Sequence, residues 1–121
     1  MIKLHPCSVD FYKQNTSSGL CSHNIYDYLN TKHGDRCYSL RIDLNGFLEK
    51  KLTKKLGAKH FRFDGEFEFD GWCFDVNGEY FFILTAPVKG TCYESSQPNN
   101  TLNASQNEIE FADYLDANIL N

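Results

Sequence analysis

Acidic side chains alternate with phenylalanines between positions 61 and 70 of the chain. Phenylalanine occupies positions 61, 63, 67 and 69, and the even positions carry Arg62 and the four acids Asp64, Glu66, Glu68 and Asp70. Successive side chains of a β-strand point to opposite faces, so this stretch is expected to have an apolar face and an acidic face. Carboxylates at that spacing repel one another, and a nearby positive charge relieves the repulsion. The chemistry they predict is the binding of a cation or of a basic protein.

A basic protein fits this pattern better than calcium does. The calcium-loop pattern D-x-D-x-D-G has only a superficial echo here, because phenylalanines fill the intervening positions and no bidentate glutamate follows at the required place. Arginines and lysines of a partner would instead be steered towards the carboxylates. The alternative is a solvated outer face that keeps a phenylalanine-rich strand soluble and protects its edge. The residues predicted to bind a partner are Asp64, Glu66, Glu68, Asp70, Asp75 and Glu79.

A cysteine nucleophile is the alternative source of activity. Cys21 directly precedes an expected helix start, where the pKa of a thiol is lowered and the thiolate can act as a nucleophile. A small Cys21-dependent hydrolase or transferase is therefore the second functional hypothesis, although a buried structural cysteine is the commoner case. The histidines show neither H-x-x-x-H nor zinc-type spacing with cysteine, so no metal and no cofactor are expected; they are His5, His23, His33 and His60.

Charge is distributed unequally along the chain, whose formal net charge is −4. Residues 1–62 contain eleven Lys and Arg against five Asp and Glu, whereas residues 63–121 contain one Lys against eleven acids. Such polarity predicts a surface of two signs, or an acidic face meant for a basic partner. Pairing between the two halves of the chain is the alternative interpretation. The lysines of residues 47–56 are not interleaved with aromatic residues, so no direct binding of nucleic acid is expected.

The cysteines and the N-terminal residues predict a cellular location. The chain has five cysteines, an odd number without a C-x-x-C pair, and Met1 is not followed by the apolar core of a signal peptide. No apolar stretch is long enough to cross a membrane. The sequence therefore predicts a cytoplasmic protein with reduced thiols and no structural disulfide.

Five strands are expected. Short strands are predicted at residues 2–4 and 91–93, and longer ones at 38–44, 60–76 and 79–86. The apolar positions change from odd to even after residue 71, which predicts a bulge or a tight turn at Asp70-Gly71. Asn77-Gly78 is a strong signal for a hairpin turn.

Three helices and one loop complete the expected elements. Helices are predicted over residues 23–32, 47–56 and 106–119, the last beginning with a capping box formed by Ser105 and Glu108. Its inward residues are expected to be Ile109, Ala112, Leu115 and Ile119. Residues 13–20 are expected to form a polar loop.

Length and element order together predict the fold and the function. A chain of 121 residues is expected to form one domain, residues 1–121, of the α+β class: an antiparallel sheet of four to five strands with about three helices packed on it. The predicted function is that of a small acidic, non-enzymatic binding protein that inhibits a basic partner. The partner expected is a toxin domain such as a nuclease, which would make the protein an immunity protein; this is an analogy of size and charge.

Overall fold

A computed structural model describes residues 1–16, 23–33, 47–64, 68–86, 90–96 and 103–120. The described residues form a five-stranded antiparallel sheet with four α-helices and a short π-helical segment, which confirms the predicted α+β class. The strands are β1 (Ile2–His5), β2 (Phe61–Asp64), β3 (Glu68–Val76), β4 (Glu79–Ala86) and β5 (Gly90–Ser95). The helical segments are α1 (Val9–Asn15), α2 (His23–His33), α3 (Phe47–Leu56), α4 (Gln106–Leu115) and the π-helical η1 (Asp116–Leu120). The strand predicted at 38–44 lies outside the described residues.

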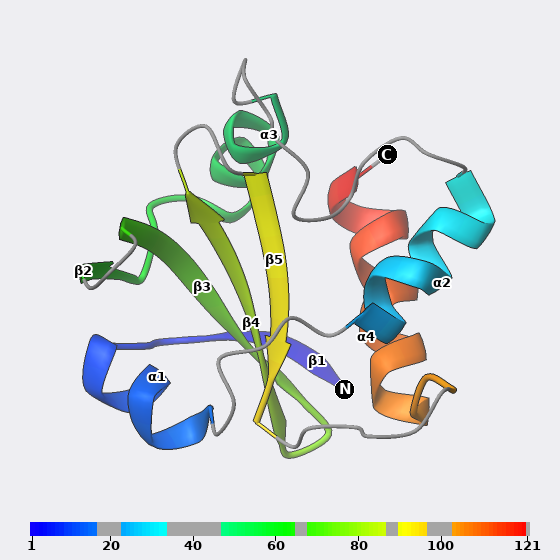
Figure 1. Ribbon diagram of the computed structural model, residues 1–121, viewed down its shortest axis with the longest axis horizontal. Coiled ribbons are helices and arrows are strands. Elements are labelled where there is room, and N and C mark those ends of the chain that lie inside the picture. The colour runs from blue at the N-terminus through cyan, green and yellow to red at the C-terminus, as the bar shows by residue number, and fades with distance from the viewer. Residues whose placement is uncertain (17–22, 34–46, 65–67, 87–89, 97–102, 121) are drawn as a thin grey trace.

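The strand β3 organises the sheet because it has neighbours along both of its edges. The path of pairing runs β1-β3-β4-β5, and β2 also pairs with β3 (Figure 1). Since β4 follows one edge of β3 from Asp70 to Val76, β1 and β2 share the other edge. They meet it one after the other: β2 pairs with residues 68–71 and β1 with residues 73–76.

The hairpin between β3 and β4 confirms the turn that the sequence predicts. Asn77 has φ 54° and Gly78 has φ 88°, the left-handed conformations that this two-residue turn requires. The Asp75 side chain accepts a hydrogen bond from the Gly78 N–H at 2.9 Å. From this turn the register continues without a break to the pair Asp70↔Thr85. The bulge or tight turn expected at Asp70-Gly71 is therefore wrong.

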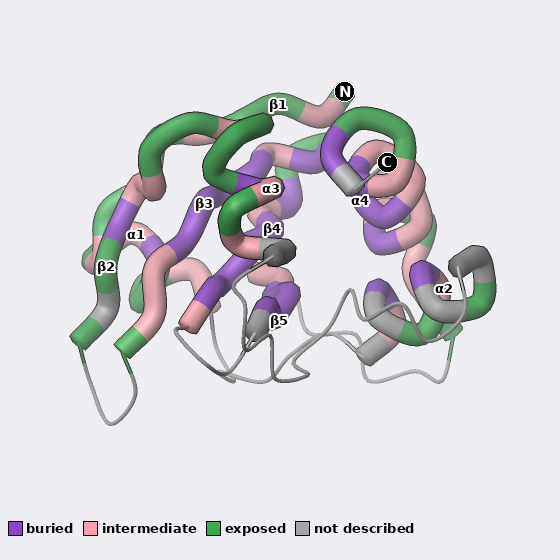
Figure 2. Tube along the Cα trace, turned by 90° about the horizontal axis from the view of Figure 1, so that it is seen from above, coloured by how far each residue is buried: buried purple, intermediate pink, exposed green. Residues whose placement is uncertain are grey.

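A helical layer explains the apparent change of parity without a bulge. The even residues of β3 remain on one face throughout, and along that face Glu68 is exposed whereas Trp72, Phe74 and Val76 are fully buried. Figure 2 shows the same change, with β3 passing from its exposed end to its buried end. The odd residue Cys73 lies on the opposite face and is also buried. The sheet is thus covered on both faces. The change from odd to even apolar positions after residue 71 marks where the helical layer begins to cover β3.

The larger core lies between the sheet and the helices α2, α3 and α4. Its fully buried helical residues are Ile25, Leu29, Leu52, Phe111, Ala112 and Leu115. The predicted capping box of α4 is confirmed: Ser105 Oγ accepts from the Glu108 N–H at 3.1 Å, and Glu108 Oε1 accepts from the Ser105 N–H at 2.9 Å. Of the four residues predicted to face inward, only Ile109 is half-buried rather than buried.

A short helix, α1, covers the other face of the sheet (Figure 1). Ser8 caps it by accepting a hydrogen bond from the Phe11 N–H at 3.1 Å, and the helix continues to Asn15, so the loop expected at residues 13–20 is wrong for residues 13–15. Tyr12 is its buried residue, and its hydroxyl donates to both carboxylate oxygens of Glu94, at 2.7 and 2.9 Å. Burial raises the pKa of Glu94, and the Tyr12 hydrogen bond offsets part of that rise.

The cysteines differ from the sequence-based expectation. Cys92 in β5 is disulfide-bonded, so the prediction of a protein without a disulfide is wrong. Cys7 and Cys73 are free thiols. In the described part of the chain, every helix is too short or too polar to span a membrane.

Candidate functional site

The predicted acidic strand is a hairpin of two strands in the structure. β2 ends at Asp64, β3 begins at Glu68, and the residues between them, Glu66 included, lie outside the described part. The two strands are antiparallel, with Asp64 opposite Glu68 and Arg62 opposite Asp70. Directly opposed residues share one face of a sheet, so these carboxylates do lie on a common face, but across two strands rather than along one.

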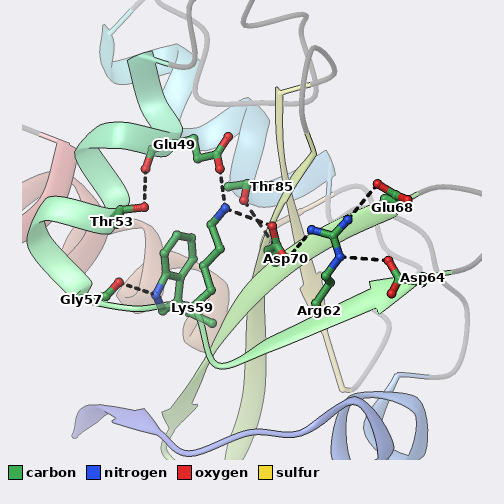
Figure 3. A network of polar contacts seen from close by, with 10 residues as sticks. Glu49, Thr53, Gly57, Lys59, Arg62, Asp64, Glu68, Asp70 and Thr85 are labelled. Atoms are coloured by element: carbon green, nitrogen blue, oxygen red, sulfur yellow. Dashed lines mark hydrogen bonds and ion pairs between the residues drawn. The ribbon is translucent and has the colours of Figure 1, made fainter.

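Arg62 lies at the centre of this carboxylate group (Figure 3). Its Nε donates to Asp64 Oδ1 at 3.0 Å, and its Nη2 donates to Glu68 Oε2 at 2.8 Å. Its Nη1 lies 3.9 Å from Asp70 Oδ1. The hydrogen bond to Asp64 and the charges of the three carboxylates raise the pKa of Arg62. The guanidinium therefore relieves the repulsion between Asp64 and Glu68.

Lys59 provides a second cation on the side facing α3. Its Nζ donates to Glu49 Oε1 and, at 3.0 Å, to Asp70 Oδ2. Burial lowers the pKa of Lys59, but the hydrogen bonds and charges of Glu49 and Asp70 outweigh it and the net shift is upward. Side chains of alternating charge thus form a row from α3 to the end of the β2–β3 hairpin.

The base of the hairpin is attached to α3 through the residues that follow this helix. Gly57 ends α3 in the left-handed conformation, φ 84°, and its carbonyl oxygen accepts a hydrogen bond from Trp72 Nε1 at 3.3 Å. Trp72 is fully buried in the larger core. This contact fixes the start of the segment that carries Lys59 and Arg62 (Figure 3).

Exposure separates the end of the hairpin from its base. The side chains of Asp64 and Glu68 are 66% and 63% exposed, whereas that of Asp70 is 15% exposed. The other two acids predicted to bind a partner have roles within the fold. Asp75 caps the β3–β4 turn, and Glu79 is buried, where it accepts from Ser95 and from Asn107 Nδ2.

A net negative charge remains at the site after these ion pairs are made. Four carboxylates, those of Glu49, Asp64, Glu68 and Asp70, surround two cations, Lys59 and Arg62. The neighbouring helix α3 presents exposed lysines, Lys50, Lys54 and Lys55. The acidic and basic surface residues that the charge pattern predicts therefore occur on neighbouring elements, the β2–β3 hairpin and α3.

The residues of the cysteine hypothesis fall largely outside the described part. Cys21 lies there, as do the side chains of His23 and His33. Within the described residues, no group of three or more His, Cys, Asp and Glu side chains is arranged to hold a metal ion. The structure instead places Cys7 against the apolar cluster that contains Cys73, whose N–H donates to His60 Nδ1, a combination whose distant sequence positions gave no signal.

Comparison of the chain with protein-family models, with curated proteins and with solved structures finds no match. The functional argument accordingly depends on the geometry of the hairpin.

Proposed function

We propose that this protein is a non-enzymatic binding protein that holds a basic partner protein on the carboxylates of the β2–β3 hairpin. The observation that carries the proposal is the exposed pair Asp64 and Glu68, placed directly opposite each other. Opposed like charges destabilise a sheet, and exposed ion pairs such as those with Arg62 contribute little to stability. The fold therefore gains little from these acids, whereas a partner with arginines or lysines gains both attraction and orientation.

The partner we propose is a toxin domain, in particular a nuclease, which this protein would inhibit as an immunity protein. A nuclease needs a basic surface for the phosphates of its substrate. A hairpin with surplus carboxylates can occupy such a surface, and its charge would speed the encounter. The support lies in the small size, the acidity and the geometry of the hairpin.

A cytoplasmic location remains part of this proposal. The Cys92 disulfide counts against it, since disulfides persist mainly in oxidising compartments. The intact mass of the protein isolated from its native cell after immediate alkylation of free thiols, with and without reductant, tests whether this disulfide is formed in the cell.

Capture of partners from a lysate of the native host tests the binding proposal. The wild type, the double variant Asp64→Lys/Glu68→Lys and a control are immobilised, and the captured proteins are identified by mass spectrometry. The matched control is Asp10→Lys/Asp27→Lys, which makes the same change of net charge at exposed helical positions. We expect a basic protein on the wild type and on the control, and a loss of about tenfold or more in its affinity for the hairpin variant.

The dependence of that affinity on salt gives the second readout. The complex of the wild type should weaken as the salt concentration rises, and the complex of the hairpin variant should weaken less. If the hairpin variant is folded and captures the same protein with unchanged affinity, Asp64 and Glu68 serve only solubility and the proposed function is wrong.

A further inference from the structure

The strand β2 forms the margin of the sheet on one side of β3. Among the described residues it pairs only with β3, and in Figure 1 and Figure 2 no further strand lies beside it. Its exposed residues are Arg62 and Asp64. A strand at the edge of a sheet presents unpaired backbone N–H and C=O groups, to which another extended segment can hydrogen-bond. The outer edge of β2 is therefore a surface with backbone groups to offer to a partner.

The pairing of β3 decides which residues of β2 direct their backbone groups outward. Residues of an antiparallel pair alternate between hydrogen-bonded and non-hydrogen-bonded positions. The two-residue turn between β3 and β4 makes Val76↔Glu79 a hydrogen-bonded pair, so the even residues of β3 bond to β4 and the odd residues face β1 and β2. The carbonyl oxygen of Gly71, which accepts from the His60 N–H at 2.9 Å, follows this alternation.

Arg62 and Asp64 are the residues whose backbone N–H and C=O point away from the sheet. Phe61 and Phe63 lie opposite odd residues of β3, so their backbone groups bond to that strand. The alternation then turns the backbone groups of Arg62 and Asp64 to the outer edge. Within the described part of the chain, no group hydrogen-bonds them there.

The two faces of β2 define which segment fits this edge. Opposed residues of neighbouring strands share one face of a sheet, so a residue added opposite Asp64 lies on the carboxylate face, near Glu68. A residue added opposite Phe61 lies on the other face, where the buried Phe61 ring stacks on Tyr12 of α1 with the ring centroids 5.1 Å apart. The first position suits a basic residue and the second an apolar one, while a neutral polar residue suits the position opposite Arg62.

We propose that an extended segment of the basic partner adds to β2 as an antiparallel strand, with a basic residue opposite Asp64 and apolar residues on either side of it. This inference rests on the proposed function, because it names the segment by which that partner is held. Antiparallel pairing matches the rest of the sheet and is slightly more stable per residue than parallel pairing. Main-chain hydrogen bonds to Arg62 and Asp64 then supply affinity, and the alternation of side chains supplies specificity.

Charged side chains on an edge strand also protect a sheet from unwanted pairing. Here the protection is selective, because the site holds four carboxylates and two cations. That surplus repels an acidic strand, and it repels the same hairpin of a second copy of the chain. A purely apolar segment would leave the repulsion between Asp64 and Glu68 as it is. A segment with a basic residue at this position reduces it, and is therefore the occupant that the charges favour.

Binding of a synthetic peptide tests the added strand. The probe is acetyl-Val-Arg-Val-Arg-Val-Thr-Val-amide, in which antiparallel addition puts the second arginine opposite Asp64 and the threonine opposite Arg62. We expect it to bind the wild type and, at saturation, to slow the hydrogen exchange of the Arg62 and Asp64 N–H groups by about tenfold or more, measured by NMR. An analogue N-methylated at that arginine and that threonine, and an analogue with glutamate in place of arginine, should each bind at least about tenfold more weakly.

Two substitutions at one position separate strand addition from the attraction of charges alone. Asp64→Asn and Asp64→Pro remove the same charge, but only proline removes the outward N–H and places its ring at the edge. Because this N–H makes no bond within the sheet, we expect both variants to fold. The peptide should bind Asp64→Pro about tenfold or more weakly than Asp64→Asn.

Three results would overturn the added strand: no binding of the peptide at about 1 mM, equal binding of its N-methylated analogue, or unchanged exchange of the Arg62 and Asp64 N–H groups in the complex. The proposed function has its own test in the capture of a basic protein. If that protein is lost with Asp64→Lys/Glu68→Lys but is bound equally by Asp64→Asn and Asp64→Pro, the carboxylate surface is supported and the added strand is refuted. If Asp64→Pro does not fold, the peptide analogues and the exchange rates of the wild type decide the matter.

Discussion

Single polar side chains complete the edge of this sheet where its strands are interrupted. His60 is the clearest example, because its imidazole accepts the backbone N–H of Cys73 at the point where β1 ends. Burial lowers the pKa of His60, and the charge of His5 lowers it further, while a hydrogen bond with the His5 backbone acts in the opposite direction. A neutral ring suits this position, since protonation of Nδ1 would remove the acceptor.

The lowered pKa of His60 predicts the direction in which stability depends on pH. The unfolded chain, where the pKa has its ordinary value of 6.5, binds the proton at a higher pH than the folded protein does. The contribution of His60 is therefore complete above that value and is lost as the pH falls through the folded pKa. Replacement by His60→Asn keeps an acceptor but removes the titration.

Urea unfolding of the wild type and of His60→Asn, from about pH 7.5 to about pH 5, measures this contribution. We expect the free energy of unfolding to fall more for the wild type than for the variant as the pH decreases. Other groups, such as Glu94 with its raised pKa, act alike in both proteins and cancel in the comparison. Parallel pH profiles would show that His60 is not held neutral by the fold.

At the level of elements, local sequence signals were reliable wherever neighbouring residues decide the structure. The Asn77-Gly78 turn, the helix α3 over residues 47–56 and the Ser105 capping box all depend on such residues, and all are confirmed. The hairpin of β2 and β3 was missed because the alternation of phenylalanines and acids resumes with the same parity after its single interruption at Gly65. Residues opposite each other in a hairpin lie on one face, so the pattern itself does not reveal that the chain reverses.

The candidate site could be predicted only in part for a related reason. The carboxylates were found from their spacing, but their exposure depends on which elements cover them. Glu79 is buried because Ser95 and Asn107, from β5 and α4, come to it, and the sequence around residue 79 holds no sign of either. The packing of Cys7 against the apolar cluster that contains Cys73 likewise follows from the pairing of β1 with β3.

Gly71 is a position at which the hairpin and the central strands approach closely. A Cβ atom there would lie 2.7 Å from Phe61 Cζ, 2.9 Å from the Ile83 carbonyl oxygen and 3.0 Å from Leu84 Cδ2. The ring of Phe61 lies over this glycine from the opposite strand. We expect Gly71→Ala to lower the free energy of unfolding by about 1–3 kcal/mol, because the backbone oxygen of Ile83 cannot move aside as a side chain can.

Chemical denaturation of Gly71→Ala beside a matched glycine variant checks this expectation. Gly57 has a positive φ and no atom within 4 Å of its Cβ position, so Gly57→Asn tests the loss of a glycine without the clash. Its loss of stability should be clearly smaller. An equal loss in the two variants would mean that the crowding at Gly71 is relieved in solution.

On the scale of the whole molecule, two apolar cores share the same two strands. The larger core contains Trp72 and Phe81, and the smaller one contains Cys73 and Phe82, so neighbouring residues of β3 and β4 enter opposite cores. Loss of these strands would therefore remove the packing of both cores. The charged hairpin extends from one end of this unit and is attached to both cores, through Trp72 on one face and through Phe61 on the other.

This arrangement predicts that the two cores unfold together. Trp72 is the single tryptophan of the chain, so its fluorescence reports on the larger core, and alkylation of the buried Cys73 thiol, read from its peptide by mass spectrometry, reports on the smaller one. Because β3 carries both residues between its neighbours, the two probes should give the same midpoint in urea. A destabilising substitution in the smaller core, Phe82→Leu, should move both midpoints to lower urea by the same amount, and Phe111→Leu should do so from the larger core. If Cys73 becomes reactive at urea concentrations where Trp72 fluorescence is still native, then α1 and its face of the sheet open separately, and the hairpin is supported from one side only.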